Sequence, residues 1–477
     1  MRKLHKHYIN GQFVEGSGSD LRPIVNPATG VQSGEMLLGT SADVDAAVSA
    51  ARAAFDSFSQ TSREERLALL NAIVAEYSKR MGEMAEVIRE EMGAPKMLAE
   101  RAHAPSGLGH CMTAAKVLQS FEFDEQQGNH TITKEPIGVV GMITPWNWPI
   151  NQITCKVAPA IATGCTMVLK PSEVAPYSAQ LFAEIIDAAG VPAGVFNMVY
   201  GEGPVVGEAM SAHPGIDMMS LTGSGRAGAA VQRAAATTIK RVALELGGKS
   251  ANILLDDVDF ETVVARDTIA VMRNSGQTCT ALTRMLVPAA RMDEAAAIAK
   301  AAAEGFAVGN PAEESSMMGP IAHQAQFEKV RAMIQKGIDE GATLVTGGLD
   351  QPDGVPSDGF YVRPTVFANV TPDMTIAREE IFGPVLSIMG YQDEDDAVRI
   401  ANDTPYGLSG AVSSADPSKA QAIARRLRTG MVHINGAPID LNLPFGGYKQ
   451  SGLGREWGEH AFNDYLEIKS MVGYSAA

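Results

Sequence analysis

The sequence predicts an α/β protein built on parallel β-sheets that are covered by helices. Between residues 137 and 247, apolar runs alternate with stretches of helical period, as is typical of successive βαβ units. The runs are almost continuously apolar, as expected of strands covered on both faces. A second stretch of this kind follows at about 250–430, and 477 residues allow two or three domains.

The N-terminal part of the chain is expected to combine strands and helices. Residues 7–14 (HYINGQFV) place Asn-Gly between short apolar stretches, the signature of a two-residue hairpin turn. The segment 61–93 opens with a capping box from Ser62 to Glu65, continues with apolar residues at helical spacing and meets a breaking Gly93. This segment is therefore predicted to form one long helix or a pair of helices.

Two segments differ from this α/β pattern. Residues 119–136 read as two polar strands joined at residues 127–129, and an isolated hairpin is only marginally stable. It either pairs elsewhere, for example across a subunit interface, or is a plain surface hairpin. Residues 347–360, rich in Gly, Asp and Pro, predict a surface loop.

Composition and charge exclude several classes of function. The net charge is −16 and no long Lys/Arg cluster occurs, so nucleic acid is not expected as a partner. No run of about 18 apolar residues and no signal-peptide pattern is present, so we expect a soluble, cytoplasmic protein without a membrane partner. Four cysteines without paired spacing fit a reducing compartment, and the nine histidines show no metal-binding spacing, so no metal site is expected.

Residues 221–228 (LTGSGRAG) follow the predicted strand 216–222 and open a helix, which is the setting of a Rossmann-like dinucleotide fingerprint. The backbone amides of Ser224 and Gly225 could hold a pyrophosphate at the helix N-terminus. The alternative is a tight structural turn with no ligand.

Two groups of polar residues compete for the ribose of such a cofactor. Glu245 in LELGGKS lies about 20 residues after the fingerprint, where an acid usually binds the ribose. Lys170 and Glu173 in VLKPSE, at the end of an earlier strand, could bind the ribose instead and leave Glu245 free to act as a base. A solvated charge pair is the simpler interpretation of Lys170 and Glu173.

Two short motifs contain candidate catalytic side chains. The motif TPWNWP (144–149) fixes a rigid loop from which Asn147 could donate a hydrogen bond to a developing oxyanion. The motif RNSGQTCTA (273–281) sets Cys279 among small and polar residues, although a free cysteine usually packs as a small hydrophobe. A structural asparagine turn and a buried structural thiol are the alternatives.

Taken together, these motifs resemble the aldehyde dehydrogenase superfamily, in its hydrolytic, NAD(P)-dependent branch. The motifs PWNWP, KPSE, TGS, LELGGKS, GQTC, EEIFGPV and PFGGYKQSGLGRE occur in the family's order and spacing over nearly the whole chain. The resemblance implies that Cys279 attacks the aldehyde to give a thiohemiacetal, while Asn147 and the Cys279 amide hold the oxyanion. It also implies that Glu245 is the general base for thioester hydrolysis, with Lys156 and Glu456 either on its proton path or in a structural ion pair.

The resemblance implies NAD as the cofactor, with NADP possible. The residues it assigns to the cofactor are Thr144, Trp146, Lys170, Glu173, Gly203, Gly207, Gly223, Ser224, Glu380 and Phe382. Among them, the carboxylate of Glu173 favours the 2′-hydroxyl of NAD because it would repel a 2′-phosphate. Arg226 could soften that discrimination.

Family positions also imply the lining of the substrate tunnel. Its residues are Trp148, Gln152, Cys155, Arg273, Thr278, Thr280, Ile439 and Phe445, and a mostly apolar lining of this kind suits a medium-sized aliphatic or aromatic aldehyde. Arg273 matches one of two carboxylate-binding arginines of succinic semialdehyde dehydrogenases, but the second position holds Cys155. We therefore expect Arg273 in a structural ion pair, and Cys155 could form a reversible disulfide with Cys279.

The resemblance implies three domains and a homo-oligomer. Residues 1–117 and 137–247 would form the dinucleotide-binding domain, 248–445 the catalytic domain, and 118–136 with 446–477 a small β oligomerisation arm. The arm would extend a neighbouring subunit's sheet in a homodimer or homotetramer. The rival hypothesis is a cysteine hydrolase or acyltransferase without redox chemistry, although no Cys/His signature is present.

Overall fold

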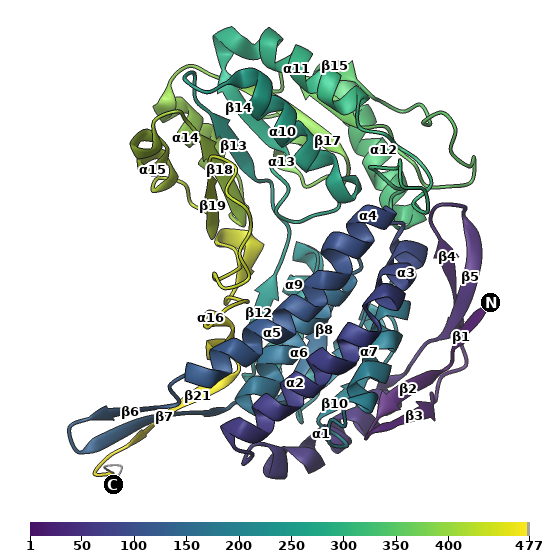
Figure 1. Ribbon diagram of the computed structural model, residues 1–477, viewed down its shortest axis with the longest axis vertical. Coiled ribbons are helices and arrows are strands. Elements are labelled where there is room, and N and C mark those ends of the chain that lie inside the picture. The colour runs from purple at the N-terminus through teal and green to yellow at the C-terminus, as the bar shows by residue number, and fades with distance from the viewer. Residues whose placement is uncertain (475–477) are drawn as a thin grey trace.

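Two helix-covered β-sheets and a projecting three-stranded arm make up the structure, a computed structural model that describes residues 1–474. In Figure 1 the first sheet lies in the lower lobe and the second sheet in the upper lobe. The arm leaves the lower lobe at its left side and contains the C-terminal strand. The predicted α/β class is confirmed.

The first sheet has eight strands, and its five central strands are parallel. The strands are β2 (Lys6–Ile9), β3 (Gln12–Glu15), β8 (Val139–Ile143), β9 (Thr166–Lys170), β10 (Phe196–Met198), β11 (Met218–Thr222), β12 (Arg241–Glu245) and β20 (Gly452–Leu453). Their order is β20-β12-β11-β8-β9-β10-β2-β3, with β2, β3 and β20 antiparallel to their neighbours. The chain order reverses between β8 and β11, and ligands of open α/β sheets bind at such a switch point.

Helices cover both faces of this sheet. Successive side chains of a strand point to opposite faces, and in these strands the side chains on both faces are apolar. Val140 and Met142 of β8 join the large core under α2, α5, α6 and α7, whereas Val139 and Ile143 join the core under α1, α8 and α9. The helices of this lobe are α1 (Ser41–Phe58), α2 (Arg63–Lys79), α3 (Met81–Met92), α4 (Lys96–Leu98), the π-helix η1 (Ala99–His103), α5 (Ala104–Ser120), α6 (Pro149–Thr163), α7 (Tyr177–Ala188), the π-helix η2 (Gly203–Gly207), α8 (Glu208–Ala212), α9 (Gly225–Ala235) and the 3₁₀-helix η3 (Ala236–Thr238).

The local predictions for the N-terminal part are confirmed. Strands β2 and β3 form a hairpin whose turn residues, Asn10 and Gly11, have φ angles of 52° and 74°. The segment 61–93 is a pair of helices rather than one: Ser62 and Glu65 form the capping box of α2, and Gly93 ends α3 in the left-handed conformation.

The second sheet has seven strands, and only its edge strand β15 is antiparallel. The strands are β13 (Ala251–Leu254), β14 (Arg284–Pro288), β15 (Thr343–Thr346), β16 (Thr365–Ala368), β17 (Val385–Tyr391), β18 (Ser409–Ser413) and β19 (Met431–Ile434), in the order β15-β16-β17-β14-β13-β18-β19. The helices of this lobe are α10 (Phe260–Met272), the 3₁₀-helices η4 (Arg273–Gly276) and η5 (Ala289–Arg291), α11 (Met292–Glu304), α12 (Gln324–Asp339), α13 (Thr375–Arg378), α14 (Glu394–Asn402) and α15 (Pro417–Ala424). The predicted loop 347–360 contains neither helix nor strand.

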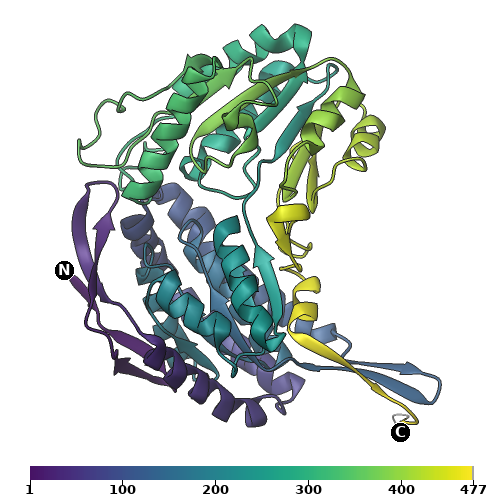
Figure 2. The ribbon, with the colours of Figure 1, turned by 180° about the vertical axis from the view of Figure 1, so that it is seen from behind.

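The polar hairpin pairs with the C-terminal strand of its own chain. Strands β6 (Asp124–Gln127) and β7 (His130–Pro136) form the hairpin, and β21 (Leu466–Met471) runs antiparallel to β7. Figure 2 shows the resulting ribbon standing clear of the lobes. The last three residues of the expected arm, 475–477, lie outside the described residues.

Smaller elements complete the fold. A separate three-stranded sheet consists of β1 (Arg2–Leu4), β4 (Leu21–Asn26) and β5 (Val31–Leu37), and the 3₁₀-helix η6 (Lys449–Ser451) and α16 (His460–Asp464) follow near the C-terminus. Strand β20 comes from the segment 446–477 that we assigned to the arm, yet it joins the first sheet. The proposed domain boundaries otherwise stay a prediction.

Candidate active site

The ends of the parallel strands in the first sheet supply most of the predicted polar residues. Strand β9 ends at Lys170 and β12 at Glu245, while Thr144 directly follows β8 and Gly223 directly follows β11. Because carboxyl ends of parallel strands meet at one edge of a sheet, residues from four separate motifs face the same side.

The loop that carries Cys279 has an unusual backbone. Asn274, Ser275 and Gly276 all have positive φ angles, of 54°, 55° and 69°. A side chain at Gly276 would lie 2.0 Å from the carbonyl oxygen of Gly383, so only glycine fits there. Left-handed backbone at non-glycine residues costs on the order of 1 kcal/mol each or more and is typical of functional sites.

Hydrogen bonds hold this strained loop in place. The Asn274 side chain donates to the carbonyl oxygens of Asn147 (3.0 Å) and Gln277 (3.2 Å). The Ser275 hydroxyl donates to the carbonyl of Gly319 at 2.8 Å, and the side-chain oxygen of Gln277 accepts from the backbone of Ala322 at 2.9 Å. The conformation before Cys279 is therefore fixed from several sides.

Cys279 is half-buried and remains a free thiol. It packs against a small apolar cluster of Cys155, Leu408, Phe445 and Trp457. Burial, followed by the nearby carboxylates of Glu380 and Glu245, raises the pKa of the Cys279 thiol. A thiol in this setting needs a base to become a nucleophile.

Asn147 connects the loop after β8 to the loop of Cys279. Its side-chain nitrogen donates to the carbonyl oxygen of Gln277 at 3.0 Å, and the residue is buried. The neighbouring Trp148 donates from its indole nitrogen to the hydroxyl of Thr278 at 3.0 Å. The Asn147 amide thus lies beside the nucleophile loop, where an oxyanion donor has to be.

Glu245 is a buried carboxylate whose two oxygens have no hydrogen-bond partner among the described residues. Burial, followed by the charge of Glu456, raises its pKa well above the ordinary range. Glycine at position 446 leaves room for this carboxylate, because a side chain there would lie 2.6 Å from one of its oxygens. A raised pKa suits a group that takes up a proton near neutral pH.

A buried ion pair lies near Glu245. The Lys156 ammonium forms an ion pair with Glu456 and also donates to the Ser220 hydroxyl at 3.1 Å. Burial is the largest influence on Lys156 and lowers its pKa, but the charge and hydrogen bond of Glu456 together with Cys155 and Glu245 outweigh burial, so the pKa is raised. The Cys155 thiol donates to Glu456 at 3.4 Å, so Cys155 belongs to this group as much as to the substrate side.

The predicted cofactor residues divide into two groups, and the first lies at the ends of β9 and β11. The Lys170 ammonium donates to the carbonyl oxygens of Pro171 and Gly201, both at 2.8 Å, and contacts Glu173 at 3.3 Å. Burial is the largest influence on Glu173 and raises its pKa, but the charge and hydrogen bond of Lys170 together with Arg22 and a backbone hydrogen bond outweigh burial. The pKa is therefore lowered and the side chain is anionic. The Ser224 hydroxyl caps α9, a helix of 11 residues.

Two glycines assigned to this first group differ in their surroundings. A side chain at Gly207 would lie 3.4 Å from Ile143, so η2 passes close to β8 at this point. Gly203, at the start of η2, is exposed and has open space around it.

The second cofactor group lies beside the Gly-Gly turn after β12. One oxygen of Glu380 accepts from the backbone nitrogen of Gly248 at 3.0 Å, and its other oxygen would collide with any side chain at Gly247. Phe382 has a φ of 59° and packs edge-on against Trp146, with 5.5 Å between the ring centroids. The second cofactor group thus consists of the Glu380 carboxylate and the Phe382–Trp146 aromatic pair, on the side of the site that faces the second sheet.

Sequence reasoning missed the residues of α12 that hold this second group. The Gln326 side chain donates to the carbonyl oxygens of Ile381 and Phe382, both at 2.9 Å, and Lys329 donates to the carbonyl of Glu380 at 2.8 Å. These residues lie more than 50 positions from the loop in the sequence, and no local motif marks them.

The residues predicted to line the substrate tunnel differ in burial. Trp148, Gln152, Cys155 and Phe445 are buried or half-buried near Cys279, and Thr278 and Thr280 flank it. Ile439 differs from the others in burial, because its side chain is 49% exposed, and its place in the lining stays a prediction.

The prediction of a structural ion pair for Arg273 is wrong. Arg273 is exposed and has no ion-pair partner among residues 1–474. It directly precedes the left-handed segment that begins at Asn274.

Aromatic and imidazole rings that were not predicted complete the apolar side of the site. Trp457 stacks on Phe445 with 4.3 Å between the ring centroids, and His110 lies against Trp457 at 5.1 Å. His103 stacks on Trp148 at 3.9 Å. No sequence pattern relates these helix residues to the C-terminal segment.

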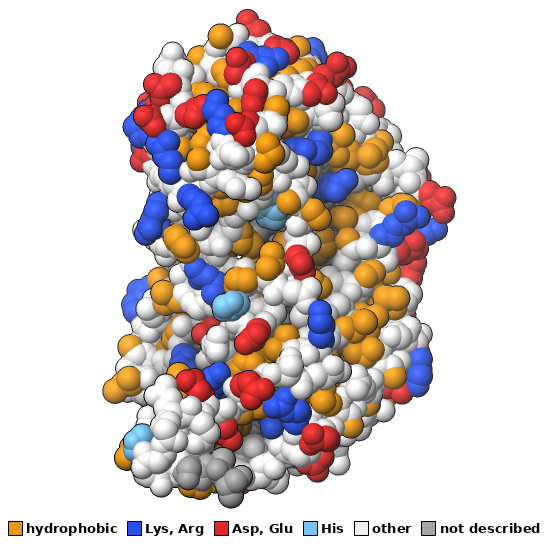
Figure 3. Space-filling model, turned by 60° about the vertical axis from the view of Figure 1, so that its left-hand side comes forward, with side chains coloured by type: hydrophobic (Ala, Val, Ile, Leu, Met, Phe, Trp, Pro, Cys, Tyr) orange, Lys and Arg blue, Asp and Glu red, His pale blue; other side chains and the backbone are white. Residues whose placement is uncertain are grey.

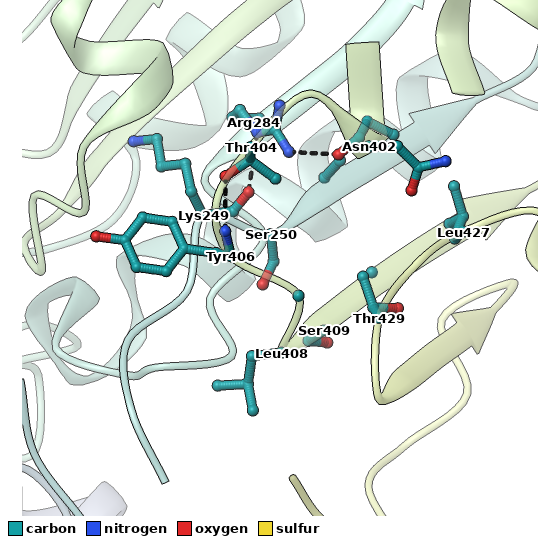
Figure 4. Close-up of a pocket in the computed structure, with 14 residues that line it drawn as sticks. Lys249, Ser250, Arg284, Asn402, Thr404, Tyr406, Leu408, Ser409, Leu427 and Thr429 are labelled. Carbon is teal, nitrogen blue, oxygen red and sulfur yellow. Dashed lines mark hydrogen bonds between the residues drawn. The ribbon is translucent and has the colours of Figure 1, made fainter. Parts of the chain in front are cut away.

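A separate small cavity lies among the amino ends of β13, β14 and β18 (Figure 4). Its volume is about 10 Å³, room for roughly one water molecule. The hydroxyls of Ser250 and Ser409 line it without a hydrogen-bond partner, and Arg284 nearby donates to the carbonyl of Ala401 at 2.8 Å. The cavity is too small for a substrate.

Three further features concern surface charge, metal-ligand side chains and helix hydropathy. Acidic and basic side chains are interspersed over the face shown in Figure 3. Among the described residues, no group of three or more His, Cys, Asp or Glu side chains is arranged to hold a metal ion. Within residues 1–474, no helix has the length and apolarity needed to cross a membrane.

Comparison with known proteins gives matches over the whole chain. Residues 13–471 match the model of the aldehyde dehydrogenase family. A 3-succinoylsemialdehyde-pyridine dehydrogenase from a Pseudomonas species is 52% identical, with 100% of both chains covered, and a putative aldehyde dehydrogenase from Staphylococcus aureus is 48% identical, with 99% of this chain and 100% of the relative covered.

Solved structures give the same picture. A cysteine-to-alanine mutant of aldehyde dehydrogenase C from Pseudomonas syringae, in complex with NAD⁺ and octanal, superposes with a TM-score of 0.98 at 50% identity, covering 99% of this chain and 97% of that one. An aldehyde dehydrogenase from Mycobacterium tuberculosis in complex with NAD⁺ superposes with a TM-score of 0.96 at 39% identity, covering 99% of each chain.

Proposed function

Because the chain belongs to the aldehyde dehydrogenase family and is an enzyme that oxidises an aldehyde to its carboxylic acid with NAD, we propose how its own residues perform that reaction. Cys279 is the nucleophile, Asn147 the oxyanion donor and Glu245 the general base. The observation that carries this assignment is the convergence of all three groups from separate motifs. Asn147 bonds to the backbone two residues before Cys279, and Glu245 lies close enough to affect its pKa.

The residues present fit a bound dinucleotide. Lys170 and Glu173 offer an ammonium and an anionic carboxylate side by side for a ribose, and the Ser224-capped end of α9 offers backbone amides to a pyrophosphate. Glu380 lies where a second ribose could be held. When bound, NAD accepts the hydride released from the substrate carbon.

The remaining steps belong to the protein. The Cys279 thiol gives its proton to a base and its sulfur adds to the aldehyde carbonyl, and the Cys279 backbone amide and Asn147 side chain donate hydrogen bonds to the resulting oxyanion. After oxidation the acyl group is a thioester of Cys279. Glu245 takes a proton from a water molecule, the water attacks the thioester, and the carboxylic acid leaves while the sulfur becomes free again.

The burial of Glu245 and the nearby carboxylate of Glu456 support its role as a base rather than a ribose ligand. Its oxygens have no partners among the described residues, and its pKa is raised by burial and Glu456. The charges of the Lys156–Glu456 ion pair then shift this pKa, which supports the ion-pair interpretation of these two residues.

We further propose a neutral aldehyde with an apolar or aromatic tail as the substrate. The rings of Trp148, Phe445 and Trp457 support it, and exposed Arg273 offers no buried cation for a carboxylate tail. The Pseudomonas relative is named for a pyridine-bearing semialdehyde, and the P. syringae structure holds octanal. A panel of straight-chain, aromatic and carboxylate-bearing aldehydes, ranked by kcat/KM, tests the proposal, which fails if succinic semialdehyde ranks first.

Cys279→Ser tests the nucleophile. The hydroxyl is a far weaker nucleophile, so NADH formation followed at 340 nm should fall to background while thermal unfolding stays unchanged. Retained dehydrogenation would overturn the assignment. Redox-free hydrolase chemistry has no support, since no histidine hydrogen-bonds to Cys279 among the described residues.

We also propose that the protein is a cytoplasmic homodimer or homotetramer. All four cysteines are free, as in a reducing compartment. The arm exposes Ile468 (71%) and Val472 (81%), and β19 leaves one edge of the second sheet unpaired within residues 1–474. Sedimentation analysis of the full chain and of a variant ending before β21 tests the assembly: an unchanged state would count against the arm.

A further inference from the structure

His103 contacts both loops of the active site from the side of the helices. It ends the π-helix η1 and is fully buried. Its Nε2 atom lies 3.1 Å from Oδ1 of Asn274, in the nucleophile loop. Its ring stacks on Trp148, next to Asn147, with 3.9 Å between the ring centroids and 17° between the planes.

The direction of the His103–Asn274 hydrogen bond follows from the partners of Asn274. The Asn274 nitrogen donates to the carbonyl oxygens of Asn147 and Gln277, so its Oδ1 must be the acceptor for His103. Burial lowers the pKa of His103 to about 4, so the ring is neutral and carries its single N–H on Nε2. The other nitrogen, Nδ1, is buried without a partner.

The side-chain hydrogen bonds of Asn274 hold an unfavourable backbone conformation and link two loops. Its φ of 54° is unfavourable for a residue with a side chain, and its amide group bridges the two loops. The Gln277 carbonyl accepts from both Asn274 (3.2 Å) and Asn147 (3.0 Å). A rotation of the Asn274 amide would therefore free the carbonyls that set where the Asn147 side chain lies.

We propose that His103 is a positioning residue for aldehyde oxidation, which fixes Asn274 and thereby holds the oxyanion donor Asn147 in register with Cys279. The stack on Trp148 fixes the adjoining wall on the substrate side. This inference rests on the proposed roles of Asn147 and Cys279. Nothing in it requires His103 to touch the substrate or to transfer a proton.

Two substitutions separate the functions of the ring. His103→Phe keeps a flat ring against Trp148 but removes the N–H, and should lower kcat by about 10- to 100-fold, as small misplacements of reacting groups do. His103→Gln keeps a donor at similar reach but loses the stack. It should retain kcat within about fivefold of the parent while raising KM for the aldehyde.

A double-mutant cycle tests whether the effect passes through Asn274. Asn274→Gly removes the amide but accepts the positive φ of 54°. In that background His103→Phe should lower kcat by no more than about twofold, because the hydrogen bond is already gone. His7→Phe, at another buried histidine, serves as the control for the loss of an imidazole and should leave kcat within about twofold.

Several outcomes would overturn the proposal. Full kcat in a folded His103→Phe variant would do so, as would equal losses in the two backgrounds. If His103→Phe does not fold, His103→Gln is tested alone, and a kcat loss above about tenfold in the folded protein contradicts a donor role. Failure of the proposed function itself is recognised separately, because Asn147→Ala would then leave kcat intact.

Discussion

Opposite shifts of the pH–rate profile are expected when either member of the buried pair Lys156–Glu456 is neutralised. The side chains of this pair are 0% and 8% exposed, and both charges act on Glu245. Glu456 raises the pKa of Glu245 and Lys156 lowers it. Glu456→Gln should therefore lower the pKa of Glu245, whereas Lys156→Met should raise it.

The size of the shift follows from burial. A charge acting on a buried carboxyl at close range typically moves its pKa by about one to three units, or roughly 1.4–4 kcal/mol. Each single variant also leaves one buried charge unpaired, which costs about 3–5 kcal/mol of unfolding free energy. The double variant removes both charges, so its profile and stability should lie closer to those of the parent.

The assay is kcat measured as NADH formation over a range of pH. Glu245 acts as a base only when it is ionised, so kcat rises with pH through its pKa. The limb moves to lower pH in Glu456→Gln and to higher pH in Lys156→Met. Lys79→Met, at an exposed pair with Glu76, is the control and should not move it. Shifts in the same direction, or no shift in either folded variant, would refute the role of Glu245 as the titrating base.

Three further changes should have distinct effects. Asn147→Ala removes one oxyanion donor and should lower kcat about 100- to 1000-fold in steady-state assays, with little change in KM for NAD; a loss below tenfold would contradict the assignment. Glu173→Gln removes the anion that repels a 2′-phosphate, so the ratio of kcat/KM for NADP to that for NAD should rise by about tenfold or more; an unchanged ratio would point to another determinant. Gln326→Leu leaves the carbonyls of Ile381 and Phe382 without their donor, at a cost of about 1–3 kcal/mol of unfolding free energy. It should raise KM for NAD more than it lowers kcat. A KM for NAD equal to that of the parent would show that the loop with Glu380 keeps its shape without Gln326.

The sequence predicted those parts of the site whose position follows from strand ends. Glu245, Lys170 and Asn147 each follow or end an apolar strand, and parallel pairing then brings them to one edge. Local signals such as the capping box at Ser62 and the turn at Asn10 were equally readable, because their hydrogen bonds join near neighbours.

The rest depends on contacts between distant segments, which no local pattern encodes. His103 and Asn274 are 171 positions apart, and their hydrogen bond exists only because η1 packs against the nucleophile loop. The ion pair expected for Arg273 failed for the same reason, since the partner would have to come from a separate element. The exposure of Ile439 likewise depends on how the C-terminal segment lies against the second sheet.

The bond from the Asn147 side chain to the Gln277 carbonyl joins a loop of the first sheet to a loop of the second. The nucleophile and the oxyanion donor thus lie on opposite halves of the molecule. The distance between them therefore depends on how the two halves are aligned. A mild denaturant that loosens the contact between the two halves should abolish turnover, while the circular dichroism of both sheets is retained. Catalysis in this protein is a property of the junction more than of either half.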